Sequence, residues 1–546
     1  MKGTVTRDRE MKRILALEKK EADIEYPDYT NEYRVEGGTW QLNDYQNKFI
    51  YDLKHNNGPF ADIPVGGGKS LASLIAGTVL KAKRPLLLVP APLREQTNKY
   101  VIPEQEKQFN ITSNVKVMSY TELSLAKNQD FMNTFKPDLI VCDEAHKLKD
   151  VKTARVKRFK RYLQKNKNVR VVLMSGSFYK AGIKDMAHLS DWTHGDQSPL
   201  PRTWRTMDLW SAAVDSGLPW NLQAKPGALR YLAEDPIRED EIKMMPVEAQ
   251  RKACRQLIHK RIYSTPGFIS PTEATLGIGL EVYELKAPKM TKPIKEAIKK
   301  LEEEWISPAG KQILLATELA SLKKQLIQGY YTYWEEEAPE IWMEARREFN
   351  NMCNRITKGS HTVDSELLFK RQYSGHPTVL HWENQKAMFR PKVLVKWICN
   401  SHIKLAGKWA KKNKKGGIIW VSNPRMGHKI EEELGIKYFG AGSGAEILEH
   451  KGMCCASVRS YGTGYNLQHY NKALWMMPLR QGDDIEQLIG RHYRRGQLAD
   501  TVEVHIICRG HEILESIYES SKKNIQVLND LKGQRQLYQI ATKIKA

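Results

Sequence analysis

Two stretches of the chain alternate short β-rich runs with amphipathic helical patterns, and this alternation restricts the fold more than any other feature. It is typical of parallel-sheet α/β units. In the first stretch the expected strands are 85–92 (PLLLVPAP), 138–142 (DLIVC) and 169–177 (VRVVLMSGS). In the second stretch they are 416–423 (GGIIWVSN), 453–460 (MCCASVRS), 473–479 (ALWMMPL) and 501–508 (TVEVHIIC). The sequence therefore predicts two α/β lobes with parallel sheets.

Between these stretches the pattern changes to helices, and few strands are expected there. A chain of 546 residues is also too long for a single hydrophobic core. We predict five parts: a basic N-terminal extension (1–38), a first lobe (39–200), a helical insertion or linker (201–388), a second lobe (389–515) and a C-terminal helical tail (516–546).

Charge and cysteine usage narrow the range of partners and compartments. The 86 Lys and Arg residues against 63 Asp and Glu give a formal charge of +23, which favours nucleic acid or another anionic surface as a partner.

No apolar run approaches the roughly 20 residues that span a bilayer. The first residues are charged throughout, unlike a signal peptide. The seven cysteines are scattered without a CxxC pair, so neither a disulfide framework nor a zinc site is indicated. We expect no membrane association and a cytoplasmic location, in a prokaryote or in a host cell if the chain is viral; a nuclear location stays open.

A glycine-rich segment directly precedes an apolar helical pattern. It contains Gly66, Gly67, Gly68, Lys69 and Ser70. Glycines let backbone N–H groups surround phosphate oxygens, lysine reaches the β and γ phosphates, and a serine hydroxyl suits Mg²⁺. The match is to the short GxGK[ST] form, because Ile63 stands where the longer motif has glycine. A flexible turn before a helix is the alternative.

Two adjacent acids, Asp143 and Glu144, follow the expected strand 138–142. Taken alone, they are equally consistent with a solvated cap on a buried strand. Together with a phosphate-binding lysine 74 residues earlier, at Lys69, they predict a nucleotide triphosphatase. In that role Asp143 orients Mg²⁺ through its water shell, and Glu144 positions the attacking water.

These motifs resemble the first lobe of superfamily-two helicases, and DEAHKLKD (143–150) is similar to the form found in their Swi/Snf-like branch of DNA translocases. LNDYQNKF (42–49) resembles the family's nucleobase-recognition segment, with Gln46 at its glutamine. LMSGSF (173–178) resembles the family's serine/threonine-glycine coupling motif. The resemblance implies that His146 links the nucleotide site to Ser175 and Ser177.

The second lobe carries the branch's other paired motifs, YGTGYNLQ (461–468) and QLIGRHYRRGQ (487–497). The resemblance implies that Gly464 and Gln487 contribute to the ATP site and that Arg491 and Arg494 act on the γ-phosphate. Gln487, Gly490, Arg491 and Arg494 are spaced i, i+3, i+4 and i+7, which predicts one face of a helix. A solvated basic helix is the alternative for the arginines.

The resemblance implies two RecA-like lobes that use ATP and Mg²⁺ to move along nucleic acid, with double-stranded DNA as the expected track. The compact form resembles minimal members carried by bacteriophages. A strand-separating or RNA-directed helicase, and a binding module with an inactive ATP site, are the alternatives. Basic residues of 147–168 are candidates for phosphate contacts, although they encircle the predicted helix and a solvated role is favoured. Protein partners are not indicated.

Overall fold

The computed structural model describes residues 3–21, 24–56, 58–63, 68–176, 178, 182–215, 218–269, 278–313, 315–360, 363–462, 464–494, 497–532 and 536–545. It contains two large parallel sheets, and all seven predicted strands are present in them. The first sheet has the order β3-β2-β4-β5-β1-β6. Its strands are β1 (Phe60–Asp62), β2 (Pro85–Val89), β3 (Lys116–Ser119), β4 (Leu139–Asp143), β5 (Arg170–Ser175) and β6 (Phe268–Ile269).

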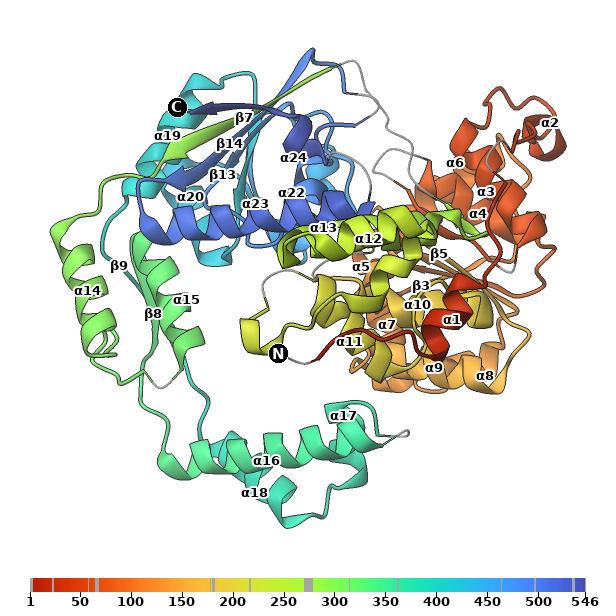
Figure 1. The fold of residues 1–546 in the computed structure, drawn as a ribbon. Helices are drawn as coiled ribbons and strands as arrows, with labels where there is room; N and C mark the ends of the chain where they lie inside the picture. Colours follow the sequence, from red (N-terminus) through yellow and green to blue (C-terminus); the bar gives the residue numbers. More distant parts are fainter. Residues whose placement is uncertain are drawn as a thin grey trace.

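The second sheet has the order β11-β12-β10-β13-β14-β7-β15. Its strands are β7 (Gly279–Lys286), β10 (Gly417–Val421), β11 (Tyr438–Phe439), β12 (Met453–Ser457), β13 (Lys472–Trp475), β14 (Thr501–Arg509) and β15 (Thr542–Lys545). Both sheets have only parallel strands and helices on two sides, which confirms the predicted α/β fold with two RecA-like lobes and a helical insertion (Figure 1).

Alternate residues of the central strands belong to different apolar clusters, because each sheet is covered on both faces. In β2, for example, Leu86 and Leu88 face one cluster, whereas Leu87 and Val89 face the other. In β10, Ile418 and Ile419 separate in the same way. Burial on both faces explains why the central strands read as continuous apolar runs.

The helices around the first sheet are α1 (Arg9–Leu15), α2 (Thr30–Tyr33), α3 (Asp44–His55), α4 (Lys69–Val79), α5 (Ala91–Gln96), α6 (Ile102–Glu106), α7 (Tyr120–Ser124), α8 (Phe131–Phe135), α9 (Ala154–Lys165), α10 (Lys184–His194), α11 (Trp204–Val214), α12 (Pro236–Met244) and α13 (Val247–Ser264). Those around the second are α19 (Ser401–Lys412), α20 (Pro424–Leu434), α21 (Val458–Tyr461), α22 (Gly482–Ile489), α23 (Glu512–Lys532) and α24 (Leu537–Ile540). The lobes also touch through α13 and α23, where Arg255 pairs with Asp530 at 3.0 Å.

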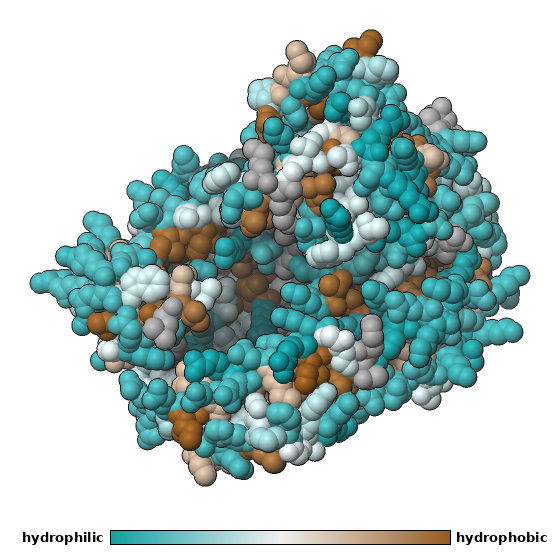
Figure 2. Space-filling view, turned by 60° about the horizontal axis from the view of Figure 1, so that its bottom comes forward, coloured by the Kyte–Doolittle hydropathy of each residue, from teal (hydrophilic) through white to brown (hydrophobic). Residues whose placement is uncertain are grey.

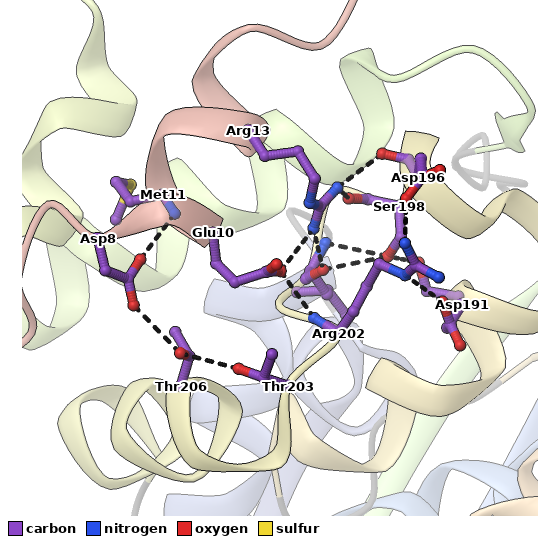
Figure 3. A network of polar contacts seen from close by, with 12 residues as sticks. Asp8, Glu10, Met11, Arg13, Asp191, Asp196, Ser198, Arg202, Thr203 and Thr206 are labelled. Carbon is purple, nitrogen blue, oxygen red and sulfur yellow. Dashed lines mark hydrogen bonds and ion pairs between the residues drawn. The ribbon is translucent and has the colours of Figure 1, made fainter.

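The structure places several predicted boundaries elsewhere. Strands β6 and β7 lie inside the predicted insertion 201–388 but belong to the first and second sheets, and β15 lies in the predicted helical tail. The sequence gives no sign of strand β7, because only Leu280 and Val282 are buried in it and it lacks an apolar run. The N-terminal extension is part of lobe one: Met11 and Ile14 are fully buried in its core, and Arg13 donates to the backbone oxygens of Asp196 and Ser198 (Figure 3).

The rest of the helical insertion extends from the second lobe. Helices α14 (Lys292–Glu303) and α15 (Ala316–Ile327) pack beside the antiparallel pair β8 (Tyr330–Trp334) and β9 (Val393–Trp397). This pair leads to residues 335–392, here called the arm, with helices α16 (Glu340–Gly359), α17 (Glu366–Gln372) and α18 (Pro377–Met388). Figure 1 shows the arm at the bottom, reaching back under lobe one. The space-filling view is hollowed near its centre (Figure 2). Among the described residues, no helix is long and apolar enough to cross a membrane.

Candidate active site

Three neighbouring strands of the first sheet bring the predicted lobe-one residues together. Strands β4, β5 and β1 are adjacent, and carboxyl ends in a parallel sheet share one edge. Helix α4 begins at Lys69 after Gly68, whose φ is +89°. The free N–H groups and dipole of a helix N-terminus attract anions, so Lys69 and the exposed Ser70 stand where a phosphate would bind. Gly66 and Gly67 lie outside the described residues.

Lys69 and Glu144 form an ion pair at the centre of this edge. Lys69 Nζ lies 2.9 Å from Glu144 Oε1, and the two side chains are only 13% and 9% exposed. Burial opposes the charge on Glu144, but Lys69 and His146 outweigh it and hold the pKa of Glu144 well below its ordinary value. Glu144 also has a φ of +54°, a region that non-glycine residues rarely adopt and that is enriched at functional sites. The carboxylate is therefore ionised and fixed in direction.

Asp143 is held at both its backbone and its side chain. The Tyr120 hydroxyl donates to the Asp143 carbonyl oxygen at 2.7 Å, and the Glu144 N–H donates to Asp143 Oδ1 at 3.0 Å. Burial and the neighbouring Glu144 raise the pKa of Asp143 to about 6, against the lowering effect of Lys69 and Arg491. A nearby cation would therefore favour its charged form.

The oxygen groups near this edge are of the kind that Mg²⁺ prefers. Across the described ranges, no three His, Cys, Asp or Glu side chains gather as ligands. Mg²⁺ typically keeps several waters and takes one or two carboxylates together with substrate phosphates. Asp143 and the Ser70 hydroxyl are oxygen groups of this kind, and that they hold Mg²⁺ stays a prediction.

His146 joins β4 to β5 through hydrogen bonds. Its Nδ1 lies 3.0 Å from Ser175 Oγ and 3.3 Å from Glu144 Oε2. Ser175 Oγ also donates to Glu144 Oε2 at 3.4 Å. The predicted link between His146 and Ser175 is thus present as a contact and includes Glu144. Ser177, the other predicted partner, lies outside the described residues.

Gln46 lies beside the start of α4. Its Nε2 donates to the Gly68 carbonyl oxygen at 3.3 Å, and its Oε1 accepts from the Asn43 N–H at 3.0 Å, as part of a capping box on α3. A Cβ on residue 68 would lie 2.4 Å from Gln46 Nε2, so this approach requires glycine. The structure brings Gln46 to the predicted phosphate site; its role with a nucleobase stays a prediction.

The second lobe contributes two arginines from a turn, which corrects the predicted continuous helix. Helix α22 ends at Ile489, and Gly490, Arg491 and Arg494 follow it. The turn is tied down because the Leu467 N–H donates to the Arg491 carbonyl oxygen at 3.2 Å. Gln487 remains in the helix, where its amide donates to Asp483 Oδ2 at 2.9 Å.

Arg491 interacts electrostatically with the acids of the first lobe. Burial lowers its pKa, whereas Glu144 and Asp143 act on it from across the lobes and raise it. Its Nη1 donates to the Tyr465 carbonyl oxygen at 3.2 Å. Its buried Nε has no hydrogen-bond partner among the described residues. A buried cation with an unused donor therefore lies within electrostatic reach of the carboxylates of the other lobe.

Arg494 lies next to Arg491 and is more exposed. Burial and the charge of Arg491 lower the pKa of Arg494 to about 10, and its Nη1 donates to Asn466. Gly464, with a φ of +97°, marks a direct contact between the lobes, because a Cβ there would lie 3.0 Å from Leu93 Cγ on α5.

No protein-family model and no curated protein matches this sequence.

Two site residues were not predicted. Tyr120 fixes the backbone of Asp143, and the Tyr465 carbonyl orients Arg491. Both act through long-range contacts, for which the local sequence gives no signal. The capping pair Asn43 and Gln46 was readable, since Asn followed three residues later by Gln is a helix-start signature.

Proposed function

We propose that this chain is an ATP-dependent DNA translocase of the Swi/Snf-like branch of helicase superfamily two, with duplex DNA as its track. The observation that carries this proposal is the cluster formed by Lys69, Asp143 and Glu144 of one lobe with Arg491 of the other. An acid pair, a lysine at a helix N-terminus and an arginine from a second lobe are the groups that hydrolysis of a nucleotide triphosphate requires. The order of the motifs along the chain supports the same assignment.

Lys69 acts as a switch between two anions. In the structure it pairs with Glu144. The β and γ phosphates of ATP compete for this ammonium, and their greater charge draws it away from the carboxylate. Glu144, held by His146 and Ser175, is then free to accept a hydrogen bond from the attacking water. Substrate binding thereby activates the group that polarises the water.

Mg²⁺ enters with ATP as part of the substrate and would be held by Asp143 and the Ser70 hydroxyl. It supplies charge neutralisation on the phosphate oxygens. Asp143 is already oriented by Tyr120, so the cation meets a fixed carboxylate.

Arg491 and Arg494 supply positive charge from the second lobe. Guanidinium groups are planar, always charged and matched to phosphate oxygens. Fixed cations of this kind stabilise the charge that develops on a γ-phosphate during transfer. The unused Nε of Arg491 is a donor available for this purpose. The guanidinium donors belong to lobe two and the acids belong to lobe one. The rate of hydrolysis therefore depends on the relative position of the two lobes, and this dependence can couple ATP turnover to movement.

Binding to the track would be mainly electrostatic. The formal charge of +23 favours contacts to the phosphate backbone, which position a protein without reading sequence. An RNA-directed helicase and a strand-separating helicase would share the same ATP site and differ in the nucleic acid that stimulates it.

Steady-state ATPase rates with duplex DNA, single-stranded DNA and RNA test the proposal, together with displacement of a triplex strand to detect tracking. We expect duplex DNA to stimulate turnover most. Lys69→Ala should reduce turnover to the background, and Lys83→Ala, which changes an exposed lysine of the same lobe, should not. Full turnover in Lys69→Ala would refute the site, and stimulation by RNA alone would refute the track.

A further inference from the structure

A cavity of about 390 Å³ lies where the arm meets the first lobe, away from the ATP site. Lobe one contributes residues of α9, α10 and the start of α11, and the arm contributes Lys358, Gly359 and Ser360 at the end of α16. Its volume is within the range of ~300–1,000 Å³ found for pockets that enclose small organic ligands. The cavity is complete only while the arm is docked.

A buried ion triad fixes the docked position. Arg158 on α9 donates from Nε and Nη2 to the two carboxylate oxygens of Asp364, at 2.9 and 2.8 Å. Arg161 adds a third hydrogen bond at 2.9 Å. The side chains of Arg158 and Asp364 are 1% and 0% exposed. Lys157, one residue before Arg158, donates to the Thr357 carbonyl oxygen of the arm. These contacts therefore hold lobe one and the arm in a fixed relative position around the cavity.

The cavity lining is strongly cationic. It includes one acid, Asp191, and six cations: Lys157, Lys160, Arg161, Lys184, Arg202 and Lys358. Three of the cations already have acid partners: Arg161 pairs with Asp364, Lys184 with Asp208, and Arg202 with Asp191 and Asp196 (Figure 3). Within the described part of the chain, the exposed Lys160 and Lys358 form no ion pair, and they belong to opposite sides of the junction. An anion between them would be attracted by both.

The cavity also presents an indole ring, that of Trp204, beside the lysines. Trp204 lines the same cavity and is 62% exposed, an unusual state for the largest apolar side chain. Lys184 Nζ lies 3.7 Å from its ring centroid. Lysines that reach phosphates and an exposed aromatic ring that stacks on a base are the combination that binds single-stranded nucleic acid without sequence preference. The carboxylates of an acidic peptide would use the lysines but offer no ring to stack on the indole, whereas every nucleotide carries a base beside its phosphate.

We propose that this cavity is a second contact site for nucleic acid, assembled jointly by lobe one and the arm, and that it takes one nucleotide of an unpaired strand. A cavity of about 390 Å³ is too small to enclose a duplex, and Lys160, Lys358 and Trp204 are the principal contacts. The assignment of nucleic acid as the ligand rests on the proposed function.

The test is a double charge reversal, Lys160→Glu with Lys358→Glu, against a matched control, Lys165→Glu with Lys386→Glu. Each pair reverses one exposed lysine of lobe one and one of the arm, so the net charge is the same. The control residues do not line the cavity. Binding of fluorescently labelled single-stranded and duplex DNA is measured by anisotropy at several salt concentrations, with duplex-stimulated ATPase as a second readout.

The cavity variant should bind single-stranded DNA at least tenfold more weakly than the control variant. Its plot of log affinity against log salt should be flatter by about 0.7, since the one phosphate held between the two lysines contributes about 0.7 on a single strand. Trp204→Ala should weaken the same binding by about tenfold, the loss typical of one base-stacking contact. Duplex-stimulated turnover should be equal in the cavity and control variants.

Equal loss in the cavity and control variants would overturn the proposal, because the effect would then be general electrostatics. Equal loss of duplex and single-strand binding would overturn the assignment to an unpaired strand. An ATPase stimulated by duplex DNA, with no effect of the cavity variant on single-strand binding, would reject this site but leave the proposed function intact. Absence of any binding and of any stimulation would reject both.

Discussion

Replacing Asp364 by alanine should release the arm from the first lobe. Its carboxylate is fully buried and accepts three hydrogen bonds from Arg158 and Arg161. After the change, Arg158 keeps the carbonyl oxygens of Leu123 and Leu125 but loses its counter-charge. Removing one member of a buried ion pair costs about 3–5 kcal/mol, because the other charge is left uncompensated.

We expect this free-energy cost to weaken docking of the arm on lobe one and to leave folding of the arm unchanged. The arm has its own apolar cluster, built around Trp342, Phe349, Phe369 and Trp382, and Ala126 is the one lobe-one residue found in it among the described residues. At about 1.4 kcal/mol for each factor of ten, the docking equilibrium should shift by roughly a hundredfold to a thousandfold or more.

Hydrogen–deuterium exchange measures the release. In Asp364→Ala, amides of α9 and α17 should exchange faster, and those of the second sheet should not change. Glu366→Ala, which removes an exposed acid two residues away, should behave as the wild type, and Arg161→Ala should have a smaller effect because its side chain is 27% exposed. Replacing both partners by apolar residues, Arg158→Met with Asp364→Leu, should restore part of the protection. Wild-type exchange in Asp364→Ala, or faster exchange throughout lobe one, would refute the reasoning.

Further predictions concern the ATP site and the pH dependence of stability. Glu144→Gln should bind ATP in an equilibrium assay but not cleave it, and normal turnover would remove its role with water. Arg494→Ala should lower kcat by about a thousandfold or more, as for other arginines that act on a γ-phosphate; a change in DNA affinity alone would contradict this. Gly68→Ala should raise the KM for ATP, because the new Cβ would lie 2.4 Å from Gln46 Nε2. Burial lowers the pKa of His402 from 6.5 to about 4. The unfolded chain therefore binds the proton more readily, and the free energy of unfolding should fall as the pH drops from about 6.5 to 4. In chemical denaturation of His402→Leu, the free energy of unfolding should fall less over the same pH range.

The central strands and the residues of the lobe-one site could be predicted because each depends on a short, contiguous pattern in the sequence. Strands such as β2 and β4 are buried on both faces and read as apolar runs. Lys69, Asp143 and Glu144 follow strands at fixed short distances, and parallel strands bring such positions to one edge. Strand β15 has exposed lysines at the sheet edge and no such run, so the sequence predicts a helical tail there and this prediction is wrong.

Contacts between residues far apart in the chain could not be predicted from the sequence. Arg158 and Asp364 are 206 positions apart, and nothing near either residue indicates the other. The basic helix α9 was expected to be solvated, yet Arg158 is buried against the arm. The helical spacing of Arg491 and Arg494 was also misleading, because the chain turns after Ile489 and is held by Leu467. Arg491 still interacts electrostatically with the acids of the other lobe, but from a turn.

The way the arm joins the second lobe makes it a detachable unit. It leaves from β8 and returns through β9, and these strands pair in antiparallel register from Tyr330 opposite Trp397 to Trp334 opposite Val393. Its two ends are therefore neighbours, and a two-residue Asn-Gly turn could close the hairpin in its place. Excision of 335–392 would then leave both parallel sheets intact, so that evolution or an experimenter can exchange this appendage without rebuilding the motor to which it is attached.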